Sequence, residues 1–267
     1  MKRDGNAPPL AAGFGPIHRL ETVESTQNAA ARAAAAGAPH GSVFRAEAQT
    51  EGRGRQGHSW DSPPGQNLYL SVLLRPRTPV AALLPLTLAA GVAAAEAVAA
   101  AVGVRPDLRW PNDLLWEGKK LAGVLLDSSS PGGAGAAAHA AILGIGINVN
   151  QTDFPPDLAA IATSLRLVLG RQADREALAA ELLRQLRRRY DQWAEGGVAA
   201  LLAAFEQASS YARGRRVRVG HDGGGGAGFT GTTAGLDAAG FLRVLRDGAP
   251  AGTAETVLGG EVRPLAG

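Results

Sequence analysis

A loop rich in glycine and arginine is the part of this 267-residue chain whose residue types are best suited to bind an anion. Residues 52–57 read Gly-Arg-Gly-Arg-Gln-Gly. Glycine lets a ligand come close to the backbone, and successive backbone N–H groups can form an anion-binding concavity. Arg53 and Arg55 add planar donors that suit carboxylate and phosphate. On composition alone, a flexible turn or an RNA-contacting segment explains this loop equally well, and the phosphate-binding Gly-x-x-x-x-Gly-Lys pattern is not matched.

A lysine at the start of an apolar strand is the second candidate. Lys120 is followed by Leu-Ala-Gly-Val-Leu-Leu. Lysine is seldom fully buried without a partner, so an inward-facing Lys120 would need an anion. Gly123 on the same strand would leave space for a ligand or another backbone. A surface lysine in a hairpin fits the same residues.

Two further segments offer polar groups or a close backbone approach. Ser25 and Thr26 stand before an expected helix, where they are first of all caps, although a helix N-terminus also presents donors to a polar ligand. Residues 144–148 read Gly-Ile-Gly-Ile-Asn within an expected strand. These glycines indicate either a ligand near the backbone or tight packing. They are not a dinucleotide-binding fingerprint, because no third glycine opens a helix.

Hydrophobic periodicity and turn residues predict the elements that must position these segments. The expected strands span residues 17–23, 42–48, 67–74, 107–116, 119–127 and 141–149. The expected helices span residues 25–36 and 78–102, with an irregularity at Pro85, and a third begins at Asp174. After about residue 210, short strands and glycine turns replace the helical pattern, which predicts a small C-terminal β-barrel.

Composition bounds the class of protein. The chain is 45% apolar and 19% charged, as in ordinary globular proteins, and it has no cysteine, which excludes disulfides and thiolate chemistry. The net charge of +3 is spread, and its densest cluster, four arginines at 184 and 187–189, is expected to be a solvated helix face. Residues 80–95 lack charge but are shorter than a membrane span, so a buried helix is expected. Without targeting or membrane signals, the expected location is the cytoplasm.

Taken in order, these segments resemble the biotin protein ligases. That family carries Asp/Glu-Ser-Thr, Gln-x-x-Gly-Arg-Gly-Arg-x-Gly-x-x-Trp, Asn-Leu-Tyr-x-Ser, Trp-Pro-Asn-Asp with Lys-Leu-Ala-Gly-x-Leu, Gly-x-Gly-Ile-Asn, and a C-terminal Gly-Gly-Glu. This chain has these motifs at residues 24–26, 49–60, 67–71, 110–125, 144–148 and 259–261. The resemblance covers residues 17–263, and six ordered motifs do not arise readily by chance.

The resemblance implies a fold class and a domain arrangement. The expected class is α+β, a mixed β-sheet flanked by helices as in class II aminoacyl-tRNA synthetases and biotin synthetases, plus a small SH3-like C-terminal β-barrel. The expected domains are a flexible N-terminus at 1–15, a catalytic ligase domain at 16–210 and the barrel at 211–267. Family members that repress transcription carry an N-terminal helix-turn-helix domain. Only about 16 residues precede the first expected strand here, so no specific DNA binding is expected.

The resemblance also implies a two-step reaction. Biotin would attack the α-phosphorus of ATP, with Mg²⁺ present, to give biotinyl-5′-AMP and pyrophosphate. A lysine of a biotin carboxyl carrier protein, of the acetyl-CoA carboxylase type, would then attack the mixed anhydride. Cations fixed where charge develops would stabilise the first transition state without a side-chain nucleophile.

Matching positions assign roles to individual residues. The expected catalytic residues are Lys120, Arg53 and Arg55. The residues expected to bind biotin are Ser25, Thr26, Gln27, Gln49, Arg53, Gly54, Arg55, Lys120 and Gly123. The residues expected to bind the nucleotide are Arg53, Arg55, Trp60, Asn112, Lys120 and Asn148. No metal-ligand set can be identified. Gln27 stands where Asn is more usual and Arg109 where Lys is common, and both keep the chemical class.

Other functions stay open at this point. A lipoate ligase or octanoyl transferase shares the general fold but lacks the Gly-Arg loop and the Trp-Pro-Asn-Asp element. A nucleic-acid-binding module would call for clustered aromatic platforms, and the C-terminal part offers only Phe229 and Phe241, with Tyr211 just before it. A ligand-binding protein without catalysis is disfavoured by the intact cations of the site. A homodimer is compatible with the family, and the acceptor carboxylase is not identified.

Overall fold

The computed structural model describes residues 14–129, 139–220, 228–250 and 252–265, so the predicted flexible N-terminus at 1–15 lies almost wholly outside it. The strands are β1 (Ile17–Val23), β2 (Val43–Gln49), β3 (Leu68–Leu74), β4 (Asp107–Arg109), β5 (Asp113–Trp116), β6 (Lys119–Ser129), β7 (Ala140–Ile147), β8 (Arg213–Gly220), β9 (Phe229–Leu236), β10 (Leu242–Arg246), β11 (Ala254–Val257) and β12 (Glu261–Pro264). The helices are α1 (Thr26–Ala35), α2 (Leu84–Val102), α3 (Leu165–Leu169), α4 (Arg175–Ala194) and α5 (Val198–Gln207).

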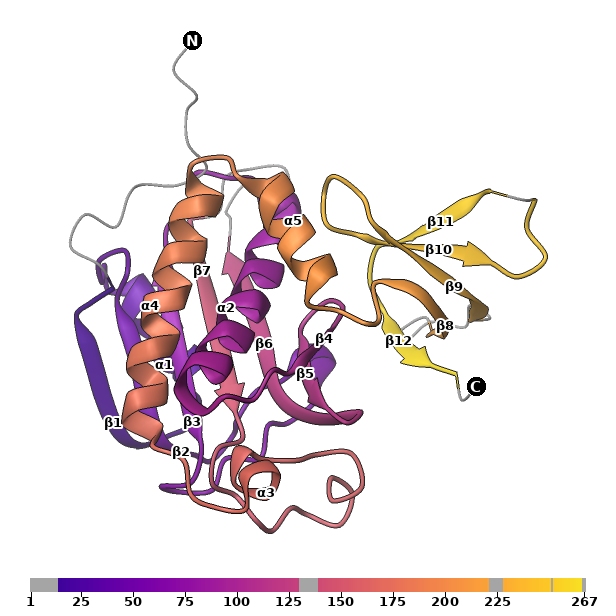
Figure 1. The fold of residues 1–267 in the computed structure, drawn as a ribbon. Helices are drawn as coiled ribbons and strands as arrows, with labels where there is room; N and C mark the ends of the chain where they lie inside the picture. The colour runs from indigo at the N-terminus through magenta and orange to yellow at the C-terminus, as the bar shows by residue number, and fades with distance from the viewer. Residues whose placement is uncertain (1–13, 130–138, 221–227, 251, 266–267) are drawn as a thin grey trace.

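A mixed seven-stranded sheet carries the first part of the chain, in the order β1-β2-β3-β7-β6-β5-β4. Only β1 and β2 pair in parallel; the other neighbours are antiparallel. In Figure 1, α2 and α4 cross the near face of this sheet and α1 lies behind it. The arrangement confirms the predicted class, a mixed sheet flanked by helices.

Side-chain alternation explains why both faces of the sheet are covered. On β3, Val72 and Leu74 enter the larger core with α2 and α4, whereas Leu73 enters a smaller core beneath α1. On β2, Val43 and Phe44 divide between the same two cores. Successive residues of a strand point to opposite faces. Strand β3, which is buried at every position, is therefore covered on both sides.

The largest differences from the expected bounds concern two elements. The helix expected at 78–102 starts at Leu84, because Pro79 leads into a separate 3₁₀ turn, Val80–Ala82, and Pro85 lies in the first turn of α2, where its missing N–H costs no bond. The extended run expected at 107–116 is divided into β4 and β5 by a turn containing Pro111, which cannot donate to a ladder. Neither α3 nor α5 was predicted as a separate element.

The apolar helix is a core element. Residues 80–102 are long and apolar enough to cross a membrane by composition, but 72% of the most apolar window is buried inside the fold. Its packing against α4 and β6 confirms the prediction of a buried helix.

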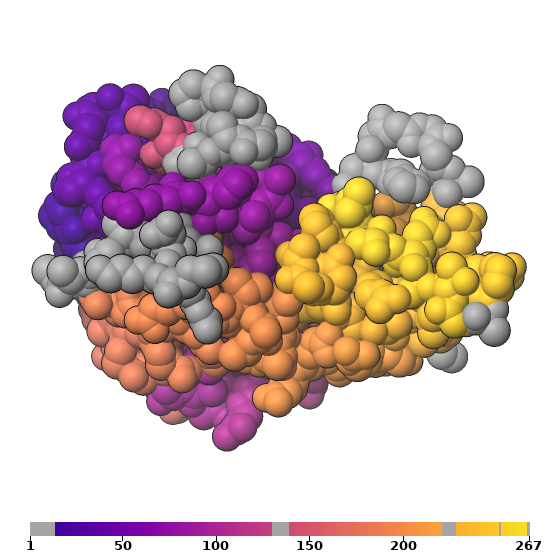
Figure 2. All heavy atoms as spheres, turned by 90° about the horizontal axis from the view of Figure 1, so that it is seen from above, coloured from indigo at the N-terminus to yellow at the C-terminus, as the bar shows by residue number. Residues whose placement is uncertain are grey.

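The C-terminal strands form an antiparallel sheet in the order β11-β10-β9-β8-β12. Figure 2 shows these residues, in yellow, as a lobe beside the rest of the chain. Among the described residues the outer strands β11 and β12 do not pair with each other, so the sheet is open, and the SH3-like barrel is not confirmed. The indole Nε1 of Trp110 donates to the carbonyl of Gly240 over 2.9 Å, which joins this lobe to the turn between β4 and β5.

Candidate functional site

Two adjoining cavities contain all the residues predicted to bind ligands. The inner cavity lies over β6 and β7, and its predicted residues are Ser25, Thr26, Gln27, Gln49, Arg53, Gly54, Arg55, Trp60, Asn112, Lys120 and Gly123. The outer cavity, about 510 Å³, lies between the main sheet and the C-terminal lobe and adds Asn148. The residues that line both cavities are Gly54, Arg55, Trp60, Asn112 and Lys120. The structure thus joins segments that lie far apart in the sequence.

The Gly-Arg loop folds back on itself above these cavities. The amide of Gly54 donates to the carbonyl of His58 over 2.7 Å, and the amide of Trp60 donates to the carbonyl of Gly52 over 2.8 Å. A Cβ at Gly52 would lie 2.3 Å from the carbonyl oxygen of Trp60, so only glycine fits there. The loop is therefore a closed turn that presents its two arginines and Trp60 from a compact base.

The two loop arginines face different partners. The Arg53 guanidinium lies 2.9 Å from Asp127 and is 46% exposed. Arg55 donates instead to the neutral amide oxygen of Asn112 over 2.9 Å. Among the described residues Arg55 has no carboxylate partner for its positive charge, whereas the charge of Arg53 is paired. Of the two arginines, Arg55 is therefore the one whose charge is available to an anion at the junction of the cavities.

A three-charge cluster stands at the same junction. Asp113 lies 2.7 Å from the Lys120 ammonium and 2.6 Å from the Arg109 guanidinium. Burial raises the pKa of Asp113, but the neighbouring Lys120 and Arg109 outweigh it and hold that pKa below its ordinary value. The carboxylate is therefore ionised, and the cluster keeps one net positive charge. The sequence did not assign Asp113 a positioning role, because this pairing joins β4, β5 and β6 in space.

Glycines form the floor of the inner cavity. Gly123 on β6 is paired in register with Gly146 on β7. A Cβ at Gly146 would lie 2.6 Å from the Trp60 ring, and one at Gly144 would lie 3.0 Å from the amide carbon of Gln27. The missing side chains make room for these two groups. The sequence marked the glycines at 144 and 146 as sites of close approach but did not include them among the site residues.

Two buried polar atoms in the inner cavity lack a hydrogen-bond partner among the described residues: Oε1 of Gln27 and Nε1 of Trp60. The Gln27 amide nitrogen has only two long contacts, 3.4 Å each, to the carbonyls of Leu125 and Ile142. Buried polar groups are nearly always paired. This acceptor and this donor therefore indicate that a polar ligand in the cavity supplies their hydrogen-bond partners.

The start of α1 is tied to the chain segments on either side of the Gly-Arg loop by a side chain predicted to bind ligand. Gln49 accepts from the amide of Thr26 and donates to the hydroxyl of Ser62, each over 2.8 Å. The hydroxyl of Ser25 caps α1 by accepting from the amides of Gln27 and Asn28. Both residues line the cavity, but much of their hydrogen bonding is internal. Their capping and bracing interactions fix the donors that face a ligand.

The inner cavity is narrow as it stands. Its free space is about 40 Å³, far below the roughly 300–1,000 Å³ of typical ligand pockets. Trp60 and Lys120 lie over Gly123, with ring and side-chain carbons 3.1 and 3.3 Å from where a Cβ would be. The Lys120 ammonium lies 5.4 Å from the Trp60 ring centroid. A ligand of ordinary size must therefore displace these two side chains.

One wall of the outer cavity is apolar. Its apolar residues include Phe154, Leu158 and Ile161, and Ile161 is 59% exposed. The sequence did not single out this segment. Asn148 donates its amide to the carbonyl of Thr163 over 3.0 Å, so it holds the end of that segment against β6. The predicted nucleotide-side residue thus shapes the cavity wall through an internal bond. In the described part of the chain, no group of three or more His, Asp or Glu side chains is placed to hold a metal ion.

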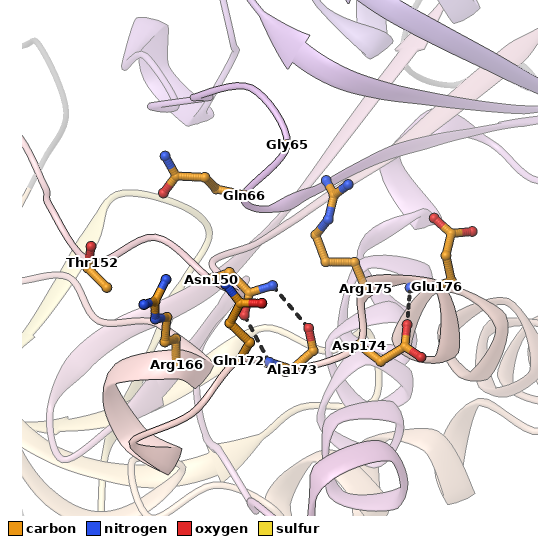
Figure 3. A pocket seen from close by; sticks show the side chains of 10 residues that line it. All are labelled: Gly65, Gln66, Asn150, Thr152, Arg166, Gln172, Ala173, Asp174, Arg175 and Glu176. Atoms are coloured by element: carbon orange, nitrogen blue, oxygen red, sulfur yellow. Dashed lines mark hydrogen bonds between the residues drawn. The ribbon is translucent and has the colours of Figure 1, made fainter.

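A third cavity, about 460 Å³, lies at the start of α4 and contains none of the predicted residues. Figure 3 shows its polar lining, with Asn150 bonded to the backbone of Ala173 and Asp174 capping α4. Arg175 is paired with Glu47 over 2.6 Å. Its charged groups are thus largely satisfied within the fold.

The arginine cluster of α4 is also internally paired. The ion pairs are Arg184 with Glu181, Arg187 with Asp191, and both Arg188 and Arg189 with Glu96. Arg184 and Arg188 are 63% and 55% exposed, as expected of a solvated helix face, whereas Arg189 is 11% exposed and its partner Glu96 lies on α2. Because these charges are paired within the fold, the cluster gives no support to a nucleic-acid surface.

The fold, with a glycine-floored cavity over its main sheet, agrees with a known class of protein. The model of the Biotin/lipoate A/B protein ligase family matches residues 20–148. A biotin–[acetyl-CoA-carboxylase] ligase of Mycobacterium tuberculosis is 40% identical over 219 residues, 79% of this chain and 77% of that protein. The biotin protein ligase of Aquifex aeolicus in complex with biotin and ATP has a TM-score of 0.78 and 28% identity, covering 95% of this chain and 100% of that one. This chain belongs to the biotin protein ligases, as its motifs predicted.

This chain covers only part of the length of some relatives. The bifunctional ligase/repressor BirA of Bacillus spizizenii is 37% identical over 196 residues, which span 73% of this chain and 58% of that protein. The activity and the partners of such a full-length ligase/repressor are therefore only proposed for this chain.

Proposed function

We propose that this protein activates biotin with ATP to biotinyl-5′-AMP and then transfers the biotinyl group to a lysine of a biotin carboxyl carrier protein of the acetyl-CoA carboxylase type. The observation that carries the proposal is the meeting of two cavities at Lys120 and Arg55. A small acid in the inner cavity and a nucleotide in the outer one would bring carboxylate and α-phosphate together at these cations. The solved Aquifex relative holds biotin and ATP.

The inner cavity suits the ureido head group of biotin. A cyclic urea has a carbonyl acceptor and N–H donors in one plane. The unpartnered Oε1 of Gln27 can accept from such an N–H, and the hydroxyls at Ser25 and Thr26 can donate to the carbonyl. Lipoate has no such group at its ring, so the same polar atoms would stay unpaired with lipoate. The proposal therefore favours biotin over lipoate as the acid.

The first step needs positive charge and no side-chain nucleophile. A carboxylate oxygen of biotin forms a bond to the α-phosphorus, and the bond to the oxygen bridging toward the β-phosphorus breaks, so that pyrophosphate leaves with the electron pair. Lys120 and Arg55 stand where the carboxylate and phosphate charges meet. Preorganised donors of this kind lower the barrier because they need no rearrangement at the moment of reaction.

The outer cavity suits MgATP as the second substrate. Its apolar wall at Phe154, Leu158 and Ile161 can cover the base, and its cationic end at the junction can hold the phosphates. Magnesium usually binds through substrate phosphates and one or two carboxylates. A dedicated protein cage is therefore not required for the metal to arrive with ATP.

In the second step the acceptor lysine attacks the acyl carbon of the anhydride, AMP leaves, and the amine loses a proton. Covering by the Gly-Arg loop would protect the reactive anhydride from water in the meantime. The proposal also includes cytoplasmic location and no specific DNA binding. A homodimer is compatible with it. A nanomolar, salt-sensitive affinity for an operator sequence would overturn the statement on DNA.

The roles of the cations are tested by pyrophosphate release from biotin and MgATP without acceptor. Lys120→Ala and Arg55→Ala should each slow release by about 100- to 1,000-fold, while the circular dichroism spectrum stays that of the parent. Lys119→Ala is the matched control, because Lys119 is exposed on the same strand and lines neither cavity. Normal release by both site variants would refute the assigned roles.

A further inference from the structure

The reaction proposed above needs a place for the departing pyrophosphate. Phosphoryl and nucleotidyl displacements run roughly in line, with the attacking and leaving oxygens on opposite sides of the phosphorus. Biotin reaches the junction from the inner cavity. Pyrophosphate must then leave into the outer cavity, on the side away from Gly123 and the biotin floor. A residue that binds it should line the outer cavity only.

Arg109 meets that condition. It is the last residue of β4, it lines the outer cavity, and it is not among the residues of the inner one. Its side chain is 25% exposed, and Asp113 fixes it by a contact of 2.6 Å. The other carboxylate oxygen of Asp113 holds Lys120. One carboxylate therefore contacts both cations, of which Lys120 lines both cavities and Arg109 lines the outer one alone.

The charges favour this end of the cavity for the phosphates. The cluster of Arg109, Asp113 and Lys120 keeps one net positive charge. Two other arginines line the outer cavity: Arg55 also lines the inner one, and Arg263 is 70% exposed and paired with Glu261 over 2.7 Å. A guanidinium has five N–H donors, and the contact with Asp113 leaves others available to phosphate oxygens.

We propose that Arg109 binds the β- and γ-phosphates of ATP and the pyrophosphate that they become, an inference that rests on the proposed function. Its charge then stabilises the leaving group as the electron pair of the breaking P–O bond moves onto the bridging oxygen. This makes Arg109 a catalytic residue of the first step alone. The second step releases AMP and involves no pyrophosphate, so it does not use Arg109.

The two half-reactions separate this role from a structural one. An arginine that served only to orient Asp113 and Lys120 would affect both steps, because Lys120 faces the adenylate in both. The variants are Arg109→Gln, Arg109→Lys, and Arg105→Gln as a control at an exposed arginine outside both cavities. For each, adenylate formation, its inhibition by pyrophosphate, and transfer from added biotinyl-5′-AMP to a carrier domain are measured.

Arg109→Gln should slow adenylate formation by about 100-fold or more, weaken inhibition by pyrophosphate, and leave transfer within about twofold. Unchanged transfer of the biotinyl group would also show that the site is correctly folded. Arg109→Lys should restore adenylate formation to within about tenfold, the cost of one ordinary hydrogen bond, with weaker inhibition by pyrophosphate than in the parent. Arg105→Gln should match the parent in all three measurements.

Equal losses in both half-reactions, or unchanged adenylate formation, would overturn the proposal. If Arg109→Gln does not fold, Arg109→Lys decides: pyrophosphate inhibition identical to that of the parent contradicts the role. A parent protein that forms no adenylate from biotin would instead refute the proposed function, so the two failures are distinguishable.

Discussion

Replacing Gln27 by methionine should change stability and ligand binding in opposite directions. In the ligand-free protein, Oε1 of Gln27 is buried without a partner among the described residues, and the two contacts of Nε2 are 3.4 Å long. An unsatisfied buried polar atom costs about 1–3 kcal/mol, and contacts of that length return little. Methionine has a similar length and no polar atom to satisfy. The free energy of unfolding should therefore stay equal or rise by about 1–2 kcal/mol.

Binding should respond in the opposite sense. If Oε1 accepts from a ureido N–H, methionine leaves that N–H unpaired in a buried site, at a cost of about 1–3 kcal/mol, or about 5- to 150-fold in Kd. Urea unfolding of the ligand-free protein and calorimetric titration with biotin measure the two quantities on the same samples. The sequence alone could not predict this sign, because it does not tell which buried amides are satisfied.

A matched control is available in a second buried glutamine. Gln185 on α4 donates to Glu181 over 2.8 Å and accepts from Arg188 over 3.1 Å, so its amide is satisfied. Gln185→Met should lower the free energy of unfolding and leave the Kd for biotin unchanged. A destabilised Gln27→Met protein with parental affinity for biotin would refute the reasoning, since Gln27 would then be a structural residue.

Two further outcomes follow from the packing and the charges. Gly146→Ala would place a Cβ 2.6 Å from the Trp60 ring, so the ring must shift at a cost of about 1–3 kcal/mol. Calorimetry should show weaker binding of biotin and ATP and a Tm lowered by roughly 2–10 °C. Unchanged affinity for both ligands would contradict the close fit of Trp60 over the glycines. Hydrogen bonds from Arg45 and Arg19 lower the pKa of Glu176 from 4.5 to about 2. A lowered carboxyl pKa adds stability above the unfolded value that is lost as pH falls through the folded one. Glu176→Gln should therefore be less stable than the parent near neutral pH, and urea unfolding should find the difference shrinking between about pH 4.5 and 2; a difference that is constant with pH would contradict this.

Local signals made much of the main sheet predictable. Strand β1 has the predicted bounds, and Ser25 caps α1 as its residue type indicates. The turn at Glu117-Gly118 joins β5 to β6 because both residues adopt positive φ, 48° and 78°, as a two-residue hairpin requires. Each of these features depends on a few neighbouring residues, which is why the sequence reveals them.

Features set by tertiary contacts were missed or misplaced. The start of α2 was placed too early because Thr78-Pro79 is a good local start, and only the fold shows that the chain first makes a 3₁₀ turn. The roles of Asp113 and of the wall around Ile161 depend on which strands lie side by side. The residues that the family motifs predict to bind ligands line two adjoining cavities in the structure. The motifs gave no sign that the side-chain amides of Asn148 and Gln49 make hydrogen bonds within the protein.

The central claim is that the acid activated and transferred is biotin. The parent protein is incubated with MgATP, a biotin carboxyl carrier domain, and either biotin or lipoate, and the carrier is analysed by mass spectrometry. The account predicts that biotin, and not lipoate, becomes attached to a single lysine of the carrier. A carrier left unmodified by biotin but modified when lipoate is supplied would contradict it.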